Sequence, residues 1–215
     1  MTPAASADDL RPWIAARLDP LEAWDPASRT VHSDYDLAPE LRPEATQLTP
    51  AAVLVPLVQR PEGLSVLLTR RTETLRKHSG QVAFPGGRSD PGEAPWTTAL
   101  REAEEEVGLD PALVSVVGLA STYETVTGYR ITPVVGFVEP RLELRLSEAE
   151  VAAVFETPFA WLMDPANTQQ QFFDRDDGVR RYFYAMPWGE QFIWGATAGI
   201  IRALRERLFG PDADR

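Results

Sequence analysis

The sequence predicts an α/β fold in which helices cover both faces of a mixed β-sheet. Two amphipathic segments have helical spacing, Pro95–Val107 and a closing segment at Gly195–Phe209. Apolar runs rich in valine and leucine have the length of strands and alternate with these helices. The runs lie at 51–59, 64–70, 113–120 and 131–138.

Length and composition set the class of protein. At 215 residues the chain can bury a sizeable core, and its 44% hydrophobic and 25% charged content is typical of a globular protein. No apolar run reaches the roughly 18 residues of a membrane span, and Met1–Leu10 lacks the apolar centre of a signal peptide. We therefore expect a cytoplasmic protein without a membrane partner. A homodimer is left open.

Charge and cysteine content exclude several functions. The net charge of −11 argues against broad binding of nucleic acid, which requires a basic surface. The absence of cysteine excludes disulfides and cysteine-based zinc sites. A phosphorylated small molecule remains compatible with this charge where a metal ion and a local basic patch screen the field.

Residues 1–49 are expected to form an N-terminal extension of a domain that spans residues 50–210. Leu10–Leu18 is long enough for two helical turns, with Pro12 at the helix start. Five prolines between residues 20 and 50 interrupt any longer element.

A basic cluster follows the first two predicted strands. Residues 51–59 and 64–70 are separated by a short turn and are predicted to pair. Residues 70–78 contain four positively charged side chains and a histidine, namely Arg70, Arg71, Arg76, Lys77 and His78. In so acidic a chain this cluster is interpreted as a site for substrate phosphates, and the alternative is an ordinary basic surface loop.

The segment between Pro95 and Gly108 is predicted to be a helix with one acidic face. Proline is favoured in the first helical turn, and a glycine often ends a helix in the left-handed conformation. At about 100° per residue, Glu102, Glu105 and Glu106 project within one arc, whereas Glu104 points elsewhere.

Clustered glutamates are unfavourable near the negative end of a helix dipole unless something compensates their charge. Mg²⁺ prefers oxygen ligands, so we predict metal ligation by Glu102, Glu106 and Glu105. Gly87 allows close backbone approach, and its carbonyl is a candidate further ligand. Arg101 and Glu93 are expected to hold the carboxylates in orientation. The alternative is a solvated acidic face, which is what most charge runs are.

The remaining elements are assigned from composition. Ser147–Val154 is predicted to be a short helix, with Glu150 as a candidate acidic residue that completes the metal site or merely helps to start this helix. Gln169–Phe173 and Arg181–Ala185 flank a turn and predict a hairpin. Three aromatic residues that follow are predicted to pack in the core, namely Trp188, Phe192 and Trp194.

The glutamate segment resembles the signature of Nudix hydrolases. The fixed positions are Gly87, Glu93 after five residues and, after seven more, Arg101-Glu-Ala-Glu-Glu-Glu-Val-Gly-Leu109, with Ala103 a smaller side chain than the family usually has. The resemblance implies an α/β/α sandwich over about residues 50–210. It also implies hydrolysis of a nucleoside diphosphate linked to another moiety, with Mg²⁺ or Mn²⁺ as cofactor.

A second resemblance narrows the substrate. Residues 67–71, 75–81 and 83–87 resemble the upstream motif of the coenzyme A pyrophosphatase branch, with Thr72 where that motif usually has serine or alanine. This implies hydrolysis of coenzyme A or its derivatives to 4′-phosphopantetheine and adenosine 3′,5′-bisphosphate. The alternatives are another Nudix substrate, such as ADP-ribose or a dinucleoside polyphosphate, and a non-catalytic nucleotide sensor.

Overall fold

The structure is a computed structural model that describes residues 7–27, 32–44, 47–72 and 80–211. Its first half contains α1 (Ala7–Ala15), β1 (His32–Ser33), β2 (Thr49–Arg60), β3 (Gly63–Arg71), β4 (Val82–Ala83), β5 (Gly86–Arg88) and α2 (Pro95–Val107). The second half contains β6 (Val114–Leu119), β7 (Tyr123–Glu124), β8 (Tyr129–Val138), β9 (Val151–Pro158), α3 (Phe159–Leu162), β10 (Gln169–Asp174), β11 (Arg180–Trp188), β12 (Gln191–Trp194) and α4 (Ala196–Phe209).

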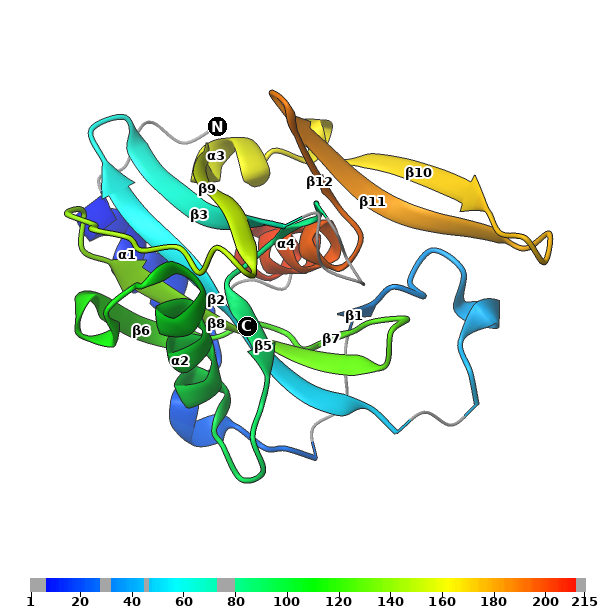
Figure 1. The fold of residues 1–215 in the computed structure, drawn as a ribbon, viewed down its shortest axis with the longest axis horizontal. Coiled ribbons are helices and arrows are strands. Elements are labelled where there is room, and N and C mark those ends of the chain that lie inside the picture. The colour runs from blue at the N-terminus through cyan, green and yellow to red at the C-terminus, as the bar shows by residue number, and fades with distance from the viewer. Residues whose placement is uncertain (1–6, 28–31, 45–46, 73–79, 212–215) are drawn as a thin grey trace.

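The main sheet is mixed. Its strand order is β1-β7-β8-β2-β3-β4, with β5 paired to β2, β6 to β8 and β9 to β3. The central pair β2 and β8 is parallel, as is β1 with β7, and the other pairs are antiparallel. The expected mixed sheet is therefore confirmed (Figure 1).

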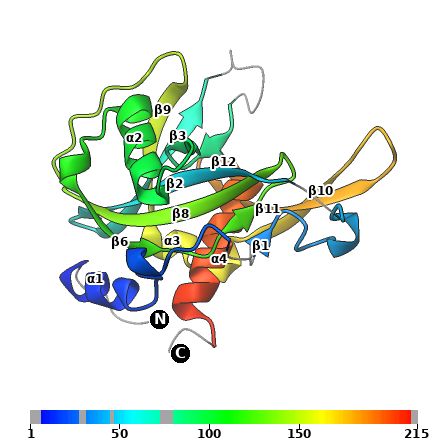
Figure 2. The ribbon, with the colours of Figure 1, turned by 90° about the horizontal axis from the view of Figure 1, so that it is seen from below.

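Helices cover both faces of this sheet. Figure 2 shows α2 on one face and α1, α3 and α4 on the other. Because successive strand residues point to opposite faces, β2 supplies both layers. Leu54 and Val58 pack with α2, while Val55 and Leu57 pack in the layer that contains α4. The α/β class with two covered faces is confirmed.

Strands β10, β11 and β12 form a separate antiparallel sheet, and its long hairpin projects from the body (Figure 1). The hairpin prediction is correct in position. The prediction that Phe192 packs in the core is wrong, because its side chain is 42% exposed. Trp188 and Trp194 are half-buried. Hydrophobic character alone does not determine burial in a projecting sheet, because such a sheet is not covered on both of its faces.

Two other local predictions are wrong. Ser147–Val154 is a turn followed by β9, because Val151 pairs with Arg71 and the strand bonds along β3. Long-range strand pairing here outweighs the weak helical propensity of the segment. Helix α1 includes Pro12 rather than starting at it, since the helix already runs from Ala7. An internal proline removes one helical hydrogen bond without ending this helix.

The N-terminal residues pack against the sheet. Ile14 and Leu18 are buried in the core, and β1 extends the sheet beside β7. No helix in the described ranges is long and apolar enough to span a membrane.

Candidate active site

Helix α2 has the predicted ends and faces. Pro95 occupies the first helical turn, and Gly108 ends the helix in the left-handed conformation with φ 67°. Ala103 and Val107 are buried against the sheet. This packing fixes the rotation of the helix about its axis, and thereby the direction of each glutamate.

Two glutamates one turn apart reach the loop that follows β4. Glu106 is 3% exposed, and its Oε2 accepts a hydrogen bond from the Gly86 N–H at 3.1 Å. Glu102 lies against Gly87, where an added Cβ would stand 2.5 Å from a carboxylate oxygen of Glu102. Strand β5 holds both glycines through its pairing with β2. Any side chain at position 87 would therefore collide with the Glu102 carboxylate, which explains the glycine at this position.

Arg101 connects three carboxylates. Its Nε and Nη2 each donate to Glu93 at 3.1 Å, and its Nη1 donates to Glu102 at 2.8 Å and to Glu105 at 3.2 Å. Glu93 also accepts from the Thr98 hydroxyl at 2.8 Å. The structure thus brings together all four of these predicted site residues, with the planar guanidinium as a fork between them.

The remaining glutamate positions differ in exposure. Glu105 is 59% exposed at its side chain and Glu104 is exposed on another face. Of the three predicted metal ligands, Glu102 and Glu106 face the loop at β5, and Glu105 is their solvent-facing neighbour.

The pKa values of these glutamates are shifted in opposite directions. The hydrogen bonds from Arg101 hold the pKa of Glu93 down to about 2. Burial raises the pKa of Glu106 to about 7, although the Gly86 N–H and Arg71 act in the opposite direction. Burial also raises the pKa of Glu102, and Glu105 and Glu150 add to that rise. Ionising Glu102 and Glu106 together is therefore unfavourable in this site.

Glu150 is held near these carboxylates by backbone contacts. The Ser147 N–H donates to the Glu106 carbonyl at 2.9 Å, and the Thr72 N–H donates to the Glu150 carbonyl at 3.0 Å. The charge of Glu150 raises the pKa values of both Glu102 and Glu106. The turn before β9 therefore carries a fourth carboxylate into the field of the α2 glutamates.

These carboxylates are a suitable donor set for a hard divalent cation. As they lie, no three acidic or histidine side chains of the described residues converge on one point. Arg101 and Arg71 contact oxygens of Glu102 and Glu106 instead. Mutually repelling carboxylates with raised pKa values and a side-chain-free backbone at Gly87 fit Mg²⁺ or Mn²⁺, because such ions take oxygen ligands and relieve the repulsion.

The basic cluster lies only partly in the described chain. Arg71 Nη1 is 3.4 Å from Glu106 Oε1, so this cation stands beside the carboxylates. Arg70 is exposed on β3. Three members fall outside the described residues, namely Arg76, Lys77 and His78.

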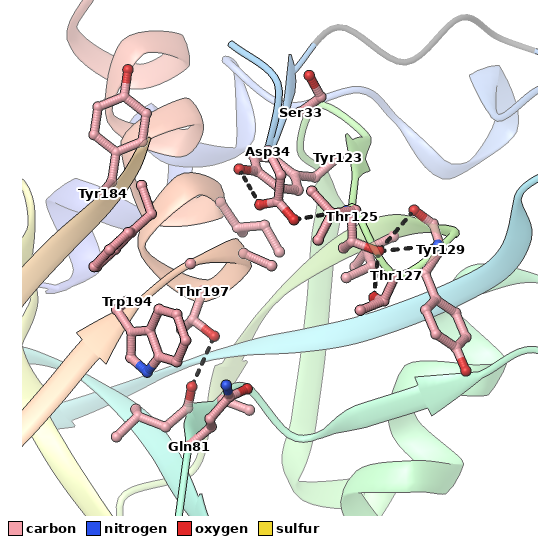
Figure 3. Close-up of a pocket in the computed structure, with 18 of the residues that line it drawn as sticks. Ser33, Asp34, Gln81, Tyr123, Thr125, Thr127, Tyr129, Tyr184, Trp194 and Thr197 are labelled. Atoms are coloured by element: carbon pink, nitrogen blue, oxygen red, sulfur yellow. Dashed lines mark hydrogen bonds between the residues drawn. The ribbon is translucent and has the colours of Figure 1, made fainter. Parts of the chain in front are cut away.

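A cavity of about 360 Å³ opens beside this site. Arg71 and Gly86, both contacts of Glu106, belong to its lining. Figure 3 shows the opposite part of the pocket, where Asp34 and Tyr123 face Trp194 and Tyr184 across the cavity. Its rings come from β7, β8, β10, β11 and β12 and from Phe84, and residues 125–127, between β7 and β8, line one side.

Sequence reasoning missed most residues of this pocket. Asp34, Arg181 and Trp194 come from three distant segments, and no spacing pattern connects them. Arg181 and Trp194 lie in a stretch rich in aromatic residues, between 172 and 194, and Asp34 has no such signal.

This chain is similar to known proteins over most of its length. The NUDIX domain model matches residues 48–188. A protein of Escherichia coli (strain K12 / DH10B), described as "Uncharacterized Nudix hydrolase NudL", is 47% identical over 171 residues, which cover 78% of this chain and 87% of that protein. The protein of the same description from Shigella boydii serotype 18 has the same identity and coverage.

Solved structures are more distant. A binary complex of a C. elegans Ap4A hydrolase has 21% identity and a TM-score of 0.45, covering 51% of this chain and 80% of that one. The E. coli ORF135 protein has 17% identity and a TM-score of 0.45, covering 78% of this chain and 96% of that one.

Proposed function

This chain belongs to the Nudix hydrolase family, and from that premise we propose that it hydrolyses the diphosphate of coenzyme A or its derivatives in a metal-dependent reaction. The products would be 4′-phosphopantetheine and adenosine 3′,5′-bisphosphate. Nudix enzymes act on small-molecule nucleotide derivatives and generally use divalent cations.

One observation carries the proposal. The buried carboxylate of Glu106 contacts both Gly86 and Arg71, and these two residues also line the adjoining pocket. A diphosphate that lies between the pocket and α2 would meet a cation from Arg71 and the carboxylates of α2. Positioning and charge neutralisation are what phosphoryl transfer mainly needs from a protein.

The proposed ligands of the cation are Glu102 and Glu106, with Glu105, the Gly87 carbonyl and Glu150 as further candidates. Bound there, a divalent cation would supply charge neutralisation on the diphosphate oxygens. Arg101 and Glu93 keep the α2 carboxylates oriented through the hydrogen bonds described above.

The chain's carboxylates would also handle the proton. Water attacks one phosphorus, the bridging P–O bond breaks, and the bridging oxygen leaves with its electron pair on the other phosphate. The proton of the attacking water passes to a carboxylate. Glu105 is the proposed acceptor because it is the most solvent-accessible of the three predicted ligands and has Arg101 as its ion-pair partner.

The coenzyme A assignment is supported by the upstream motif between residues 67 and 87 and by its basic members. Arg71 lies beside Glu106, and part of the cluster Arg70, Arg76, Lys77 and His78 is proposed to bind phosphate outside the reacting diphosphate. Coenzyme A carries such a phosphate at the 3′ position, whereas ADP-ribose does not.

A substrate screen with purified protein tests the assignment. We would measure kcat/KM in Mg²⁺ for coenzyme A, an acyl derivative, ADP-ribose and a dinucleoside polyphosphate. The proposal expects coenzyme A or its derivative to have the highest value. A higher kcat/KM for ADP-ribose or the dinucleoside polyphosphate would change the assigned substrate but not the reaction. Cleavage of none of the four compounds would favour a nucleotide sensor.

A further inference from the structure

We propose that the part of the pocket remote from α2 is an adenine subsite, in which Asp34 accepts a hydrogen bond from the 6-amino group of the base. The inference rests on the proposed function, since it concerns a substrate that contains an adenine nucleotide. It assigns a specificity role to the segment before β2, which the motifs do not include.

Asp34 reaches the pocket because β1 joins the main sheet. Strand β1 pairs with β7, and the Asp34 N–H continues the pairing by donating to the Glu124 carbonyl at 2.9 Å. This places the Asp34 side chain among the lining residues, opposite Trp194 (Figure 3). The pocket wall is therefore completed by a segment far from the family motif in sequence.

The carboxylate of Asp34 is fixed but not saturated. Its Oδ1 accepts from the Tyr123 hydroxyl at 3.0 Å, and its Oδ2 accepts from the Val126 N–H at 2.9 Å. A carboxylate offers about four acceptor positions, so each oxygen retains one. An acceptor held from behind by two donors is suited to read a donor on a ligand.

Charged neighbours determine which ligand group this end of the pocket accepts. Burial raises the pKa of Asp34 and Asp36 adds to that rise, whereas Arg181, in the same lining, acts in the opposite direction. The guanidinium of Arg181 also stacks over Tyr35 at 5.1 Å, and among the described residues its buried Nη1 has no hydrogen-bond partner. Asp34 disfavours a phosphate at its own position, so the diphosphate belongs at the Arg71 end.

Asp34 and Arg181 share the pocket lining and offer the groups that one edge of adenine requires. The Watson–Crick edge of adenine presents the 6-amino group as a donor beside N1, which accepts. Asp34 supplies an acceptor and Arg181 a donor. Hypoxanthine reverses both groups, because a carbonyl replaces the amino group and the ring nitrogen carries a proton.

Aromatic rings in the opposite wall favour a planar base over the pantetheine arm. Phe183 lies 5.3 Å from Trp194 and 6.0 Å from Phe173, measured between ring centroids, and all three line the pocket. Every nucleobase has a planar face that stacks favourably on an aromatic side chain. A flexible aliphatic amide gains less from such rings.

The test compares adenine substrates with their hypoxanthine analogues. Coenzyme A and its deaminated analogue are assayed for kcat/KM with the wild type, with Asp34→Asn and with Glu40→Gln. Glu40 is the control, because it is exposed on the same segment and does not line the pocket. We expect the wild type and Glu40→Gln to prefer adenine by about tenfold or more, and Asp34→Asn to lose or reverse the preference.

Calorimetry of adenosine monophosphate and inosine monophosphate binding to the wild type gives a second readout. This measurement needs neither cleavage nor a variant. Weaker binding of inosine monophosphate supports the subsite even if coenzyme A is not cleaved, which separates this inference from the proposed function. Equal binding of the two nucleotides by the wild type overturns it. Equal loss of activity on both bases in a folded Asp34→Asn also overturns it, since this would place another part of the substrate beside Asp34.

Discussion

Arg71 and Glu106 form an ion pair, with 3.4 Å between Nη1 and Oε1, at the boundary between helix α2 and the adjoining pocket. Arg71 ends β3, and Glu106 lies in the last turn of α2. The pair therefore joins a residue of the basic cluster to a residue of the family signature. It places the proposed phosphate-binding and metal-binding groups in contact.

Glu106→Gln should lose activity and gain stability in metal-free buffer. The glutamine keeps the size of the side chain and removes a proposed ligand charge, so kcat should fall by about a hundredfold or more. The raised pKa of Glu106, about 7 against an ordinary 4.5, means that its ionisation destabilises the fold above pH 7. That penalty is on the order of 3 kcal/mol, is absent below pH 4.5, and is removed by the substitution.

Thermal melts at pH 8 in chelator, together with kcat in saturating Mg²⁺, check both halves of this prediction. The control is Glu104→Gln, which changes the same charge on an exposed face and should alter kcat little. A normal kcat for Glu106→Gln would mean that the site lies elsewhere.

Gly87→Ala should weaken metal use without a large loss of stability. The added Cβ would stand 2.5 Å from a Glu102 oxygen, so the carboxylate must move. We expect the Mg²⁺ concentration for half-maximal activity to rise by about tenfold or more, which equals about 1.4 kcal/mol of lost binding. An unchanged Mg²⁺ dependence would show that Glu102 is not a ligand.

The Glu93–Arg101 pair should make stability pH-dependent in acid. The pKa of Glu93 is lowered to about 2, so its contribution is full above the ordinary value of 4.5 and is lost as the pH falls from there through 2. Glu93→Gln should lower the free energy of unfolding at pH 7 by roughly 2–3 kcal/mol, with the difference from wild type shrinking toward pH 2. Urea unfolding at several pH values measures this. A constant difference would rule out the ion pair as its source.

The sequence could predict the features that depend on local spacing. Positions 95 to 108 contain a complete helix with its end signals, so α2, its Gly108 terminus and the Arg101–Glu93 contact follow from a short stretch. The nearly continuous apolar run at residues 51–59 likewise predicts β2 as a strand buried on both faces.

Features that depend on long-range pairing could not be predicted. β9 forms because Val151 and the residues after it find β3 as a partner, although Ser147 and two glutamates resemble a helix start. Asp34 enters the pocket through the pairing of β1 with β7, and Arg181 through the β10–β11 hairpin. Neither carries a local signal, because their function arises only when three segments meet.

Changing Arg76 and Lys77 together to alanine tests whether these residues bind the 3′-phosphate of coenzyme A. One charge-assisted contact contributes about 1.5–3 kcal/mol, which is roughly ten- to a hundredfold in affinity. KM should therefore rise far more for coenzyme A than for dephospho-coenzyme A. The double change of Arg11 and Arg141 to alanine, two exposed arginines that do not line the pocket, is the charge-matched control. An equal rise for both substrates would assign the cluster to the diphosphate or to structure.

Product analysis tests whether the protein cleaves the diphosphate of coenzyme A and whether this cleavage requires a metal ion. Coenzyme A would be incubated with the purified protein in Mg²⁺ and, separately, in excess chelator, and the products separated and identified by mass. We expect equal amounts of 4′-phosphopantetheine and adenosine 3′,5′-bisphosphate in Mg²⁺, and neither product in chelator. Intact coenzyme A in Mg²⁺, or undiminished cleavage in chelator, would contradict this expectation.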